Sequence, residues 1–529
     1  MGLQDLNTTK EYTILRYCPS GFKLRPNQVE ILKQVEDNWD RYHVIVIPAQ
    51  VGSGKSLVAQ TIARWRASKE ETTATITPRV ALQTQYQRDF PKVPTLMGKS
   101  RYSCTSDKGL SCADHFEIYD SYCSTCPYKA AKKAVEKSDN AVFNFHSYLY
   151  SKDYKDNLIV DEAHNIYSIM SEMFSAKIWK HQHNYPDDIN VIGDVALWME
   201  GVIKSQENRI RELEDRLGSI RFSKKHKITD VHKKEEVKLY LETKKVTDRY
   251  RMVLKGIRRA PTNFFIEHKE GMYRGELKDF LYIRPTTLHD SPEILWPQST
   301  TKKIVMLSGT ITELDMSHMG LVGKKILFVD AVNPIPPENR PVIVDNLINM
   351  SWKYQEKNIP KMVDKIDEVL SKHPNKKGII HTTYGLAGKF RKKLKNKRIM
   401  WHTKEDKDEV LKKFLEAKDP VVLMACGFAE GIDLKGSNYE FQIITKIQWP
   451  SKEDKLIEYL YTHQIERIMW ETVRTVQQQI GRICRGYDDY GVTYILDSSF
   501  GNVAKKRQGL FQRTTKYWPK SVVESIKFI

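Results

Sequence analysis

Short apolar runs alternate with amphipathic stretches in the two outer parts of the chain. In the first 165 residues, these runs lie at residues 43–47, 73–77 and 157–160. The same alternation returns at residues 303–307, 378–381, 420–426, 441–445 and 492–496. Continuous apolar runs of this length, separated by helical stretches, are typical of buried parallel strands joined by crossover helices. The pattern therefore predicts an α/β fold with two domains.

The middle of the chain, roughly residues 165–299, has a helical pattern instead. Apolar side chains recur there at spacings of three, four and seven, at Ile203, Ile210, Leu213, Leu217 and Ile220. This periodicity predicts an amphipathic helix, and a second helix is expected over residues 235–254. We interpret the region as a mainly helical insertion in the first α/β domain.

Length and composition agree with this division. A chain of 529 residues exceeds what one hydrophobic core usually serves, and 40% hydrophobic with 29% charged residues is typical of a globular protein. No stretch approaches the roughly 20 apolar residues of a membrane-spanning helix, and residues 1–10 are too polar for a secretory signal. We expect a cytoplasmic monomer of prokaryotic or viral origin, without a membrane partner.

The net charge of the chain indicates what kind of partner it binds. A formal net charge of +19 and a pI of about 9.3 indicate a polyanionic partner, and nucleic acid is the leading candidate. The helical insertion is strongly basic, and we interpret its cations either as a solvated helix surface or as a path for nucleic acid. They are Lys224, Lys225, Lys227, Lys233, Lys234, Lys244, Lys245, Arg249, Arg251, Lys255, Arg258 and Arg259.

A phosphate-binding loop follows the first predicted strand. Residues 49–56 lie between an apolar run and a helical stretch over residues 57–65, which is the context that a P-loop requires. Backbone N–H groups of such a loop bind phosphate oxygens, assisted by the helix dipole. Ala49 replaces the first glycine of the general pattern. The predicted ligands are Gly52, Ser53, Gly54, Lys55 on the β and γ phosphates, and Ser56 on Mg²⁺.

Two adjacent carboxylates end another predicted strand. The apolar run at residues 158–160 is followed by the sequence Asp-Glu-Ala-His. Asp161 is predicted to hold Mg²⁺, and Glu162 to position and deprotonate the attacking water. Alone, the pair could also be the acidic first turn of a helix. Together with the P-loop, it favours a DEAH motif.

A third motif lies near the C-terminus, where Gln478, Arg482 and Arg485 have the spacing Q-x-x-G-R-x-x-R. If this segment is helical, both arginines lie on one face of the helix. Such a pair can stabilise charge on a transferred phosphoryl group if it faces a phosphate site. The alternative is a pair of surface arginines.

Several shorter elements, in this order along the chain, resemble those of the XPD/DinG family of superfamily 2 helicases. The element Arg25–Gln28 is similar to the upstream R-P-x-Q element, Thr77–Arg79 to motif Ia, and Ser308–Thr310 to motif III. Residues 427–436, with Glu430 and Asp433, look like motif V. Leu496–Phe500 departs from the family, because it lacks the arginine often found after Asp497.

The resemblance implies two RecA-like motor domains that close on ATP and move along one DNA strand from 5′ to 3′. It adds Gln28, Glu430 and Asp433 to the nucleotide contacts, and it places Pro78 and Arg79 on DNA. The implied boundaries are residues 1–96, 131–165 and 296–325 for the first motor domain and 326–529 for the second. An iron–sulfur domain would occupy residues 97–130, and an arch-like helical insertion residues 166–295.

Four cysteines lie close together in the segment before the DEAH motif. Cys104, Cys112, Cys123 and Cys126 have the spacing C-x7-C-x10-C-x2-C. Four thiolates can hold a tetrahedral zinc ion or a 4Fe-4S cluster, and zinc sites usually have two close cysteine pairs where this sequence has one. The flanking residues resemble the iron–sulfur segment of the family, which favours the cluster.

In the family, this segment is a wedge at the duplex fork, so Arg101 and Tyr102 are predicted DNA contacts. The other cysteines, Cys18, Cys426 and Cys484, are isolated, and we expect ordinary buried or partly buried thiols.

The predicted function is that of an ATP-dependent DNA helicase acting on single-stranded and on forked or tailed duplex DNA, in DNA repair or replication. Its cofactors would be ATP, Mg²⁺ and a 4Fe-4S cluster. Three alternatives stay open: a translocase that remodels complexes without separating strands, an RNA helicase, and a binding module without catalysis. Residues 49–56 and 161–162 are intact as motifs, which disfavours the last of these.

Overall fold

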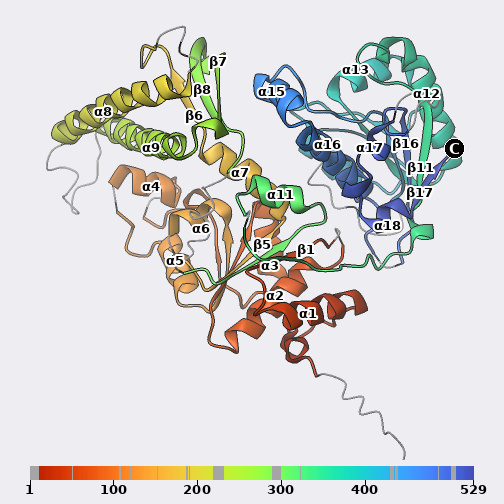
Figure 1. Ribbon diagram of the computed structural model, residues 1–529, viewed down its shortest axis with the longest axis horizontal. Helices are drawn as coiled ribbons and strands as arrows, with labels where there is room; N and C mark the ends of the chain where they lie inside the picture. Colours follow the sequence, from red (N-terminus) through yellow and green to blue (C-terminus); the bar gives the residue numbers. More distant parts are fainter. Residues whose placement is uncertain are drawn as a thin grey trace, which may run out of the picture. The chain divides into compact units, whose positions relative to one another are not determined.

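The computed structural model in Figure 1 contains two compact units along the chain. Unit 1 comprises Met1–Pro48 and Gly54–Asp330, and unit 2 comprises Ala49–Ser53 and Ala331–Ile529. The structure describes residues 11–49, 52–106, 109–119, 121–151, 153–185, 189, 191–217, 231–273, 275–288, 300–321, 323–428, 434, 439–486, 488–501 and 508–529.

A seven-stranded parallel sheet forms the centre of unit 1, in the order β10-β1-β9-β5-β2-β4-β3. Parallel neighbours need crossover connections, which here include helices. The strands are β1 (Val44–Ile47), β2 (Thr73–Thr77), β3 (Thr95–Leu96), β4 (Asn140–Asn144), β5 (Asn157–Asp161), β9 (Lys303–Leu307) and β10 (Ile326–Phe328). The helices include α1 (Pro26–Asn38), α2 (Lys55–Ala67), α3 (Val80–Asp89), α6 (Phe145–Ser151), α7 (Ile166–Met173) and α11 (Glu313–His318).

The apolar runs of this part of the chain form strands as predicted. All residues of β1, β2, β5 and β9 are buried, and the centres of β1, β5 and β9 are continuously apolar as in strands covered on both faces, whereas β2 alternates threonine with apolar residues. The predicted boundary at residue 325 needs correction. Because β10 hydrogen-bonds to β1, unit 1 continues to Asp330.

Two insertions extend unit 1. The first, which carries the four clustered cysteines, contains α4 (Cys112–Tyr119) and α5 (Pro127–Glu136). The second contains two long helices, α8 (Ile192–Leu217) and α9 (Val231–Arg259), close to the two predicted helices. It also contains an antiparallel sheet, in the order β6-β8-β7, that the sequence analysis missed. Its strands are β6 (Ala176–Trp179), β7 (Phe264–Tyr273) and β8 (Glu276–Pro285).

Helices α8 and α9 pack side by side in opposite directions (Figure 1). Near the start of α8, Val195 and Met199 share a buried cluster with Val253 and Ile257, which lie near the end of α9. At the other end of the pair, Leu213 of α8 packs in a cluster with residues near the start of α9. The described part of the hairpin is thus held by apolar contacts along its length.

Unit 2 has its own seven-stranded parallel sheet, in the order β13-β14-β12-β15-β16-β11-β17. The strands are β11 (Val342–Ile348), β12 (Lys377–Thr382), β13 (Ile399–Met400), β14 (Val422–Cys426), β15 (Tyr439–Ile444), β16 (Val492–Asp497) and β17 (Ile526–Phe528). The helices include α12 (Gln355–Lys372), α13 (Tyr384–Lys393), α14 (Lys407–Glu416), α15 (Lys455–His463), α16 (Ile465–Ile480), α17 (Leu510–Arg513) and α18 (Lys520–Val523). Both units thus have the predicted α/β architecture.

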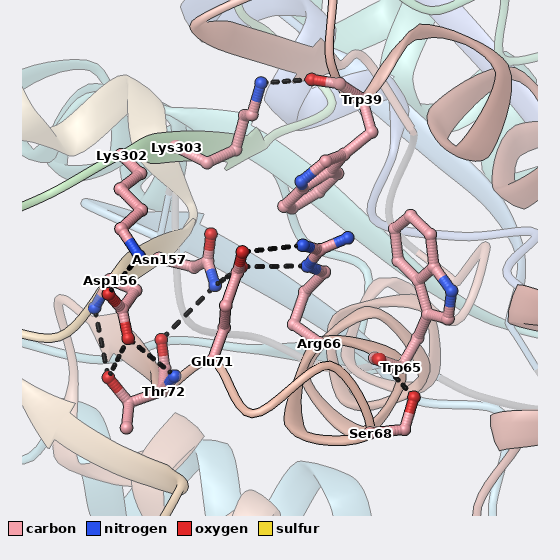
Figure 2. Close-up of polar contacts among 10 residues, drawn as sticks. All are labelled: Trp39, Trp65, Arg66, Ser68, Glu71, Thr72, Asp156, Asn157, Lys302 and Lys303. Carbon is pink, nitrogen blue, oxygen red and sulfur yellow. Dashed lines mark hydrogen bonds and ion pairs between the residues drawn. The ribbon is translucent and has the colours of Figure 1, made fainter.

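The amino edge of the unit 1 sheet, where its strands begin, is closed by a polar network (Figure 2). Arg66 lies against the rings of both Trp39 and Trp65, at 4.8 and 4.7 Å, and forms an ion pair with Glu71 at 2.7 Å. Nearby, the ammonium group of Lys303 donates hydrogen bonds to the backbone carbonyls of Trp39 and Tyr42.

At the same edge, Asp156 connects the starts of β2, β5 and β9. Asp156 accepts hydrogen bonds from the backbone N–H and hydroxyl of Thr72 at 2.9 and 2.8 Å, and pairs with Lys302 at 2.8 Å. Asn157 donates to Glu71 at 2.9 Å. Every charged side chain in this network therefore has a polar partner (Figure 2).

Candidate active site

The P-loop lies where β1 ends and α2 begins, at the carboxyl edge of the unit 1 sheet. Gly52 and Gly54 have φ angles of 87° and 79°, in the left-handed region that favours glycine. Gly54 also lies against α1, because the amide of Gln28 donates to its carbonyl at 3.3 Å. A Cβ atom on Gly54 would overlap that amide. The residue predicted from the R-P-x-Q element thus supports the turn of the loop.

Lys55 and the two carboxylates of the DEAH motif meet at this edge. The Lys55 Nζ atom lies 3.2 Å from Glu162 Oε1, and only 8% of the Lys55 side chain is exposed. Asp161 is buried at the end of β5, and its Oδ2 atom accepts a hydrogen bond from Tyr86 Oη at 3.2 Å. Ser56 also hydrogen-bonds to Tyr86. The predicted phosphate and Mg²⁺ groups therefore converge.

Burial dominates the electrostatics of this cluster. Loss of hydration, and then the neighbouring charge of Glu162, raise the pKa of Asp161 to about 6. Burial and the charge of Asp161 raise the pKa of Tyr86 well above its ordinary value. Asp161 is ionised above about pH 6, at a cost that a bound cation would offset. Tyr86, on α3, was not predicted, since nothing in the local sequence points to Asp161.

Glu162 has an unusual backbone conformation. Its φ of 51° is in the left-handed region, which costs free energy in residues with a side chain. His164 Nδ1 lies 3.4 Å from Glu162 Oε2 and 2.8 Å from Ser308 Oγ. Ser308 follows β9 and belongs to the predicted motif III. A polar chain thus joins the predicted catalytic base to motif III.

In unit 2, the segment that contains Arg482 and Arg485 is not helical, so the two arginines do not lie on one face of a helix. Helix α16 ends at Ile480, so Gln478 lies in its last turn and both arginines follow the helix. Cys484, between them, has a φ of 57°, which no α-helix contains. The backbone N–H of Arg485 donates to Asp489 at 2.9 Å, and both arginine side chains are largely buried.

A buried amide holds the end of α16. Gln442, on β15, donates to the carbonyl of Ile480 at 2.9 Å and to Thr493 Oγ1 at 2.8 Å. Its oxygen lies 3.2 Å from His381 Nε2. Burial lowers the pKa of His381 to about 4, so this histidine is neutral at physiological pH. Gln442 was not predicted, and it fixes the point from which Arg482 departs.

Two known families match this chain. Residues 366–517 match the Helicase C-terminal domain, and residues 21–185 match the Type III restriction enzyme, res subunit. A probable ATP-dependent helicase of Methanocaldococcus jannaschii is 21% identical, over 91% of this chain and 92% of its own length.

Solved structures share the fold. An XPD helicase has a TM-score of 0.60 at 15% identity, covering 96% of this chain and 100% of its own. The Xpd4 protein of S. tokodaii has a TM-score of 0.54 at 14% identity, with coverage of 96% and 100%. The chain thus shares the fold of XPD helicases, and its C-terminal part matches a helicase domain.

The remaining predicted contacts lie in several places. Pro78 and Arg79 follow β2 at the carboxyl edge of the unit 1 sheet, and Arg79 is the N-cap of α3. Glu430 and Asp433 lie outside the described residues. Among the described helices, none is long and apolar enough to cross a membrane.

The four clustered cysteines are buried together. Cys112 begins α4, and Cys126 caps α5, where its sulfur accepts from the Lys129 N–H at 3.4 Å. The Cys112 and Cys126 sulfurs are 3.6 Å apart, and Cys104 hydrogen-bonds to Cys123. All four belong to one apolar cluster, and all seven cysteines of the chain are free thiols.

The thiols differ in acidity. Burial raises the pKa of Cys112 to about 11. Burial acts in the same direction on Cys123, but hydrogen bonds, mainly with Thr105, outweigh it and lower the pKa of Cys123 to about 7. Among the described residues, no three His, Cys, Asp or Glu side chains are arranged to hold a metal ion. The four thiols lie in two pairs, Cys112 with Cys126 and Cys104 with Cys123.

Aromatic residues surround these cysteines. Tyr102 packs edge-on against Tyr128 at 5.6 Å, and its hydroxyl accepts from the backbone N–H of Met97 at 3.1 Å. Arg101 is exposed. Tyr102 thus has a packing role, and contact of Tyr102 or Arg101 with DNA stays a prediction. Cys18 and Cys484 are partly buried and Cys426 is buried, as expected for ordinary thiols.

Proposed function

We propose that this chain is an ATP-dependent DNA helicase that moves along single-stranded DNA and separates duplex DNA. The convergence of Lys55, Ser56, Asp161 and Glu162 at one edge of a parallel sheet carries the proposal. It joins a phosphate-binding loop, a cation site and a base within a few ångströms, as nucleotide hydrolysis requires.

Each of these groups has a separate task in hydrolysis. Lys55 would neutralise the β and γ phosphates, while Ser56 and Asp161 would hold Mg²⁺. Glu162 orients the attacking water and accepts its proton. A hydrogen bond joins His164 to Ser308 of motif III, which follows β9. We propose that this bond couples the nucleotide state of the site to motif III.

Unit 2 contributes Gln478, Arg482 and Arg485. We propose that the two guanidinium groups stabilise the charge that develops on the transferred phosphoryl group. Because both arginines follow α16 rather than lie within it, their direction depends on the turn at Cys484 and on the anchor at Gln442.

The cysteine segment would hold a 4Fe-4S cluster, with Cys104, Cys112, Cys123 and Cys126 as ligands. Their chemistry fits this group, since all four are thiols in one apolar cluster. A bound cluster would fix the segment as a wedge where duplex strands part. Zinc is the alternative, and iron analysis with visible absorption after anaerobic purification distinguishes the two.

Nucleic acid binding is supported by the net charge of +19, and Pro78 and Arg79 are the proposed strand contacts. DNA as the substrate, and movement from 5′ to 3′, are inferred from the resemblance to XPD/DinG helicases. The residues of the ATP site are compatible with either direction.

The deciding experiment compares Lys55→Ala with Lys69→Ala, a control at an exposed lysine beyond the end of α2. ATP turnover and strand separation are measured on duplexes with a 5′ tail, a 3′ tail, a 5′ RNA tail or blunt ends. We expect the control to separate the 5′-tailed DNA and Lys55→Ala to lose turnover and separation.

Other outcomes correct the proposal in defined ways. Turnover without separation on any substrate would identify a translocase, and preference for the RNA tail would identify an RNA helicase. Wild-type turnover in Lys55→Ala would refute the assignment of the P-loop.

A further inference from the structure

A basic groove lies between α8 and α9 in the helical insertion of unit 1. It encloses about 640 Å³. Six cations line it, namely Lys204, Arg211, Arg251, Lys255, Arg258 and Arg259, together with the carboxylates Glu200 and Glu207. Six positive and two negative charges give the lining a net charge of +4. We call this feature the α8/α9 groove.

The cations of the α8/α9 groove fall into two classes. Arg251 pairs with Glu207 at 2.6 Å and Asp248 at 2.7 Å, and Arg258 pairs with Glu200. The other four cations form no ion pair within the part of the chain that the structure describes; they are Lys204, Arg211, Lys255 and Arg259. Exposed ion pairs contribute little free energy, so even the paired arginines can exchange a carboxylate for another anion.

The groove is preformed, because the helices on both sides are fixed by packing. Ile203 and Leu254 form its floor with only 8% and 6% of their surface exposed, and both belong to the cluster that holds α8 against α9. The charged side chains stand on this rigid base. A ligand would therefore meet cations on two walls without ordering the backbone first.

Helix α9 also contacts the cysteine segment. Helix α4, which starts at Cys112, packs against α9, and Met252 of α9 contacts the apolar cluster that contains the four cysteines. One helix thus presents cations to the groove and also supports the cysteine segment. Because α9 belongs to both, the groove lies near the cysteine segment, which we propose separates the strands of duplex DNA.

We propose that the α8/α9 groove binds the phosphodiester backbone of the nucleic acid on which the protein acts. This inference rests on the proposed function and adds a second contact to Pro78 and Arg79. An acidic protein segment is the less suitable occupant, because protein interfaces draw affinity from apolar and aromatic anchors and the two apolar residues of this groove are buried. Phosphates need only the cations and release counterions when they bind.

The test compares two double variants by fluorescence anisotropy of labelled oligo(dT) between 50 and 300 mM salt. Lys204→Gln with Lys255→Gln removes one unpaired cation from each wall. Lys238→Gln with Lys245→Gln is the control, since both lysines are exposed on α9 outside the groove. If both groove lysines contact phosphates, the slope of log affinity against log salt falls by about 1.4, at about 0.7 for each contact on a single strand. The control slope should stay near that of the wild type.

Two further measurements make the result decisive. Circular dichroism and thermal unfolding establish that both variants are folded, and ATP turnover without DNA should equal that of the wild type in both. Equal loss of slope in the groove and control variants would overturn the inference, because general charge alone would explain it. Binding of labelled polyglutamate that only the groove variant loses, with oligo(dT) binding unchanged, would overturn it in favour of an acidic protein partner.

The proposed function fails separately from the groove. If the wild type neither binds oligo(dT) nor hydrolyses ATP, the helicase assignment is wrong. If the wild type does both and the groove variant behaves as the control does, only the groove assignment is wrong.

Discussion

The two edges of the unit 1 sheet use buried charge in opposite ways. At the amino edge, Arg66, Glu71 and Lys303 have partners that satisfy their charges (Figure 2). At the carboxyl edge, Asp161 and Glu162 are adjacent carboxylates, and burial raises the pKa of Asp161 to about 6. One helix joins the two edges, because α2 begins at Lys55 and has Arg66 in its last turn.

This difference indicates which edge stabilises the fold and which performs chemistry. A buried charge with a complete set of partners costs little and holds strands in place, whereas a crowded pair of carboxylates costs free energy until a cation binds. Strain points the same way, since Glu162 has a left-handed backbone conformation. Mutations at the amino edge should therefore change stability, and those at the carboxyl edge activity.

The largest expected effect is on catalysis at the carboxyl edge. Glu162→Gln keeps the shape of the side chain but cannot accept a proton, so single-turnover ATP hydrolysis should fall by about 10²–10⁴-fold. Nucleotide affinity and melting temperature should stay close to those of the wild type. Equal losses of affinity and hydrolysis would show that Glu162 binds the nucleotide rather than acting as a base.

At the amino edge, Arg66→Ala removes the partner of Glu71 and the cation that lies against the rings of Trp39 and Trp65. We expect unfolding free energy to fall by about 2–4 kcal/mol, because a partly buried carboxylate loses its partner. ATP turnover per folded molecule should be unchanged at low temperature. A catalytic defect without loss of stability would contradict the division between the edges.

Asp161→Asn should stabilise the protein in the absence of metal and nucleotide. The folded pKa of Asp161, about 6, lies above the unfolded value of about 3.9, so ionisation costs the folded state free energy above pH 6. We expect a gain of about 1–3 kcal/mol at pH 7.5 that shrinks as the pH falls from 6 to 4. Chemical denaturation across this range measures it. Destabilisation at pH 7.5 would mean that the Asp161 carboxylate is already compensated.

The smallest expected effect concerns Asp156 at the amino edge. Burial opposes its ionisation, but Lys302 and Thr72 outweigh burial and lower the pKa of Asp156 to about 2. The ionised form thus stabilises the fold above about pH 4, and this contribution is lost as the pH falls toward 2. Asp156→Asn should cost less than about 1 kcal/mol at pH 7, since Lys302 is exposed and solvent screens the pair. A cost that persists unchanged at pH 2.5 would assign it to hydrogen bonds instead of charge.

Much of the fold could be predicted from local sequence. The apolar runs became strands in both sheets, and the spacing in the middle of the chain identified the helices that became α8 and α9. The hairpin of β7 and β8 was missed, because its two apolar runs, residues 264–266 and 280–283, are short and are separated by mostly charged and polar side chains. The condition that the segment with the C-terminal arginines be helical is not met, because α16 ends at Ile480. A favourable spacing does not reveal where a helix ends.

The sequence by itself determined the chemistry of the nucleotide site: a glycine loop before a helix, and two carboxylates at the end of an apolar run. These signals are local, since residues within a few positions of one another form the loop and the strand end. Only the tertiary structure decided which distant side chains complete the site. Tyr86 reaches Asp161, and Ser308 reaches His164, because the order of strands in the sheet brings their elements together. Part of the amino-edge network has the same origin, since Asp156 pairs with Lys302 and Asn157 donates to Glu71 across strands, whereas Arg66 and Glu71 are only five residues apart along the chain.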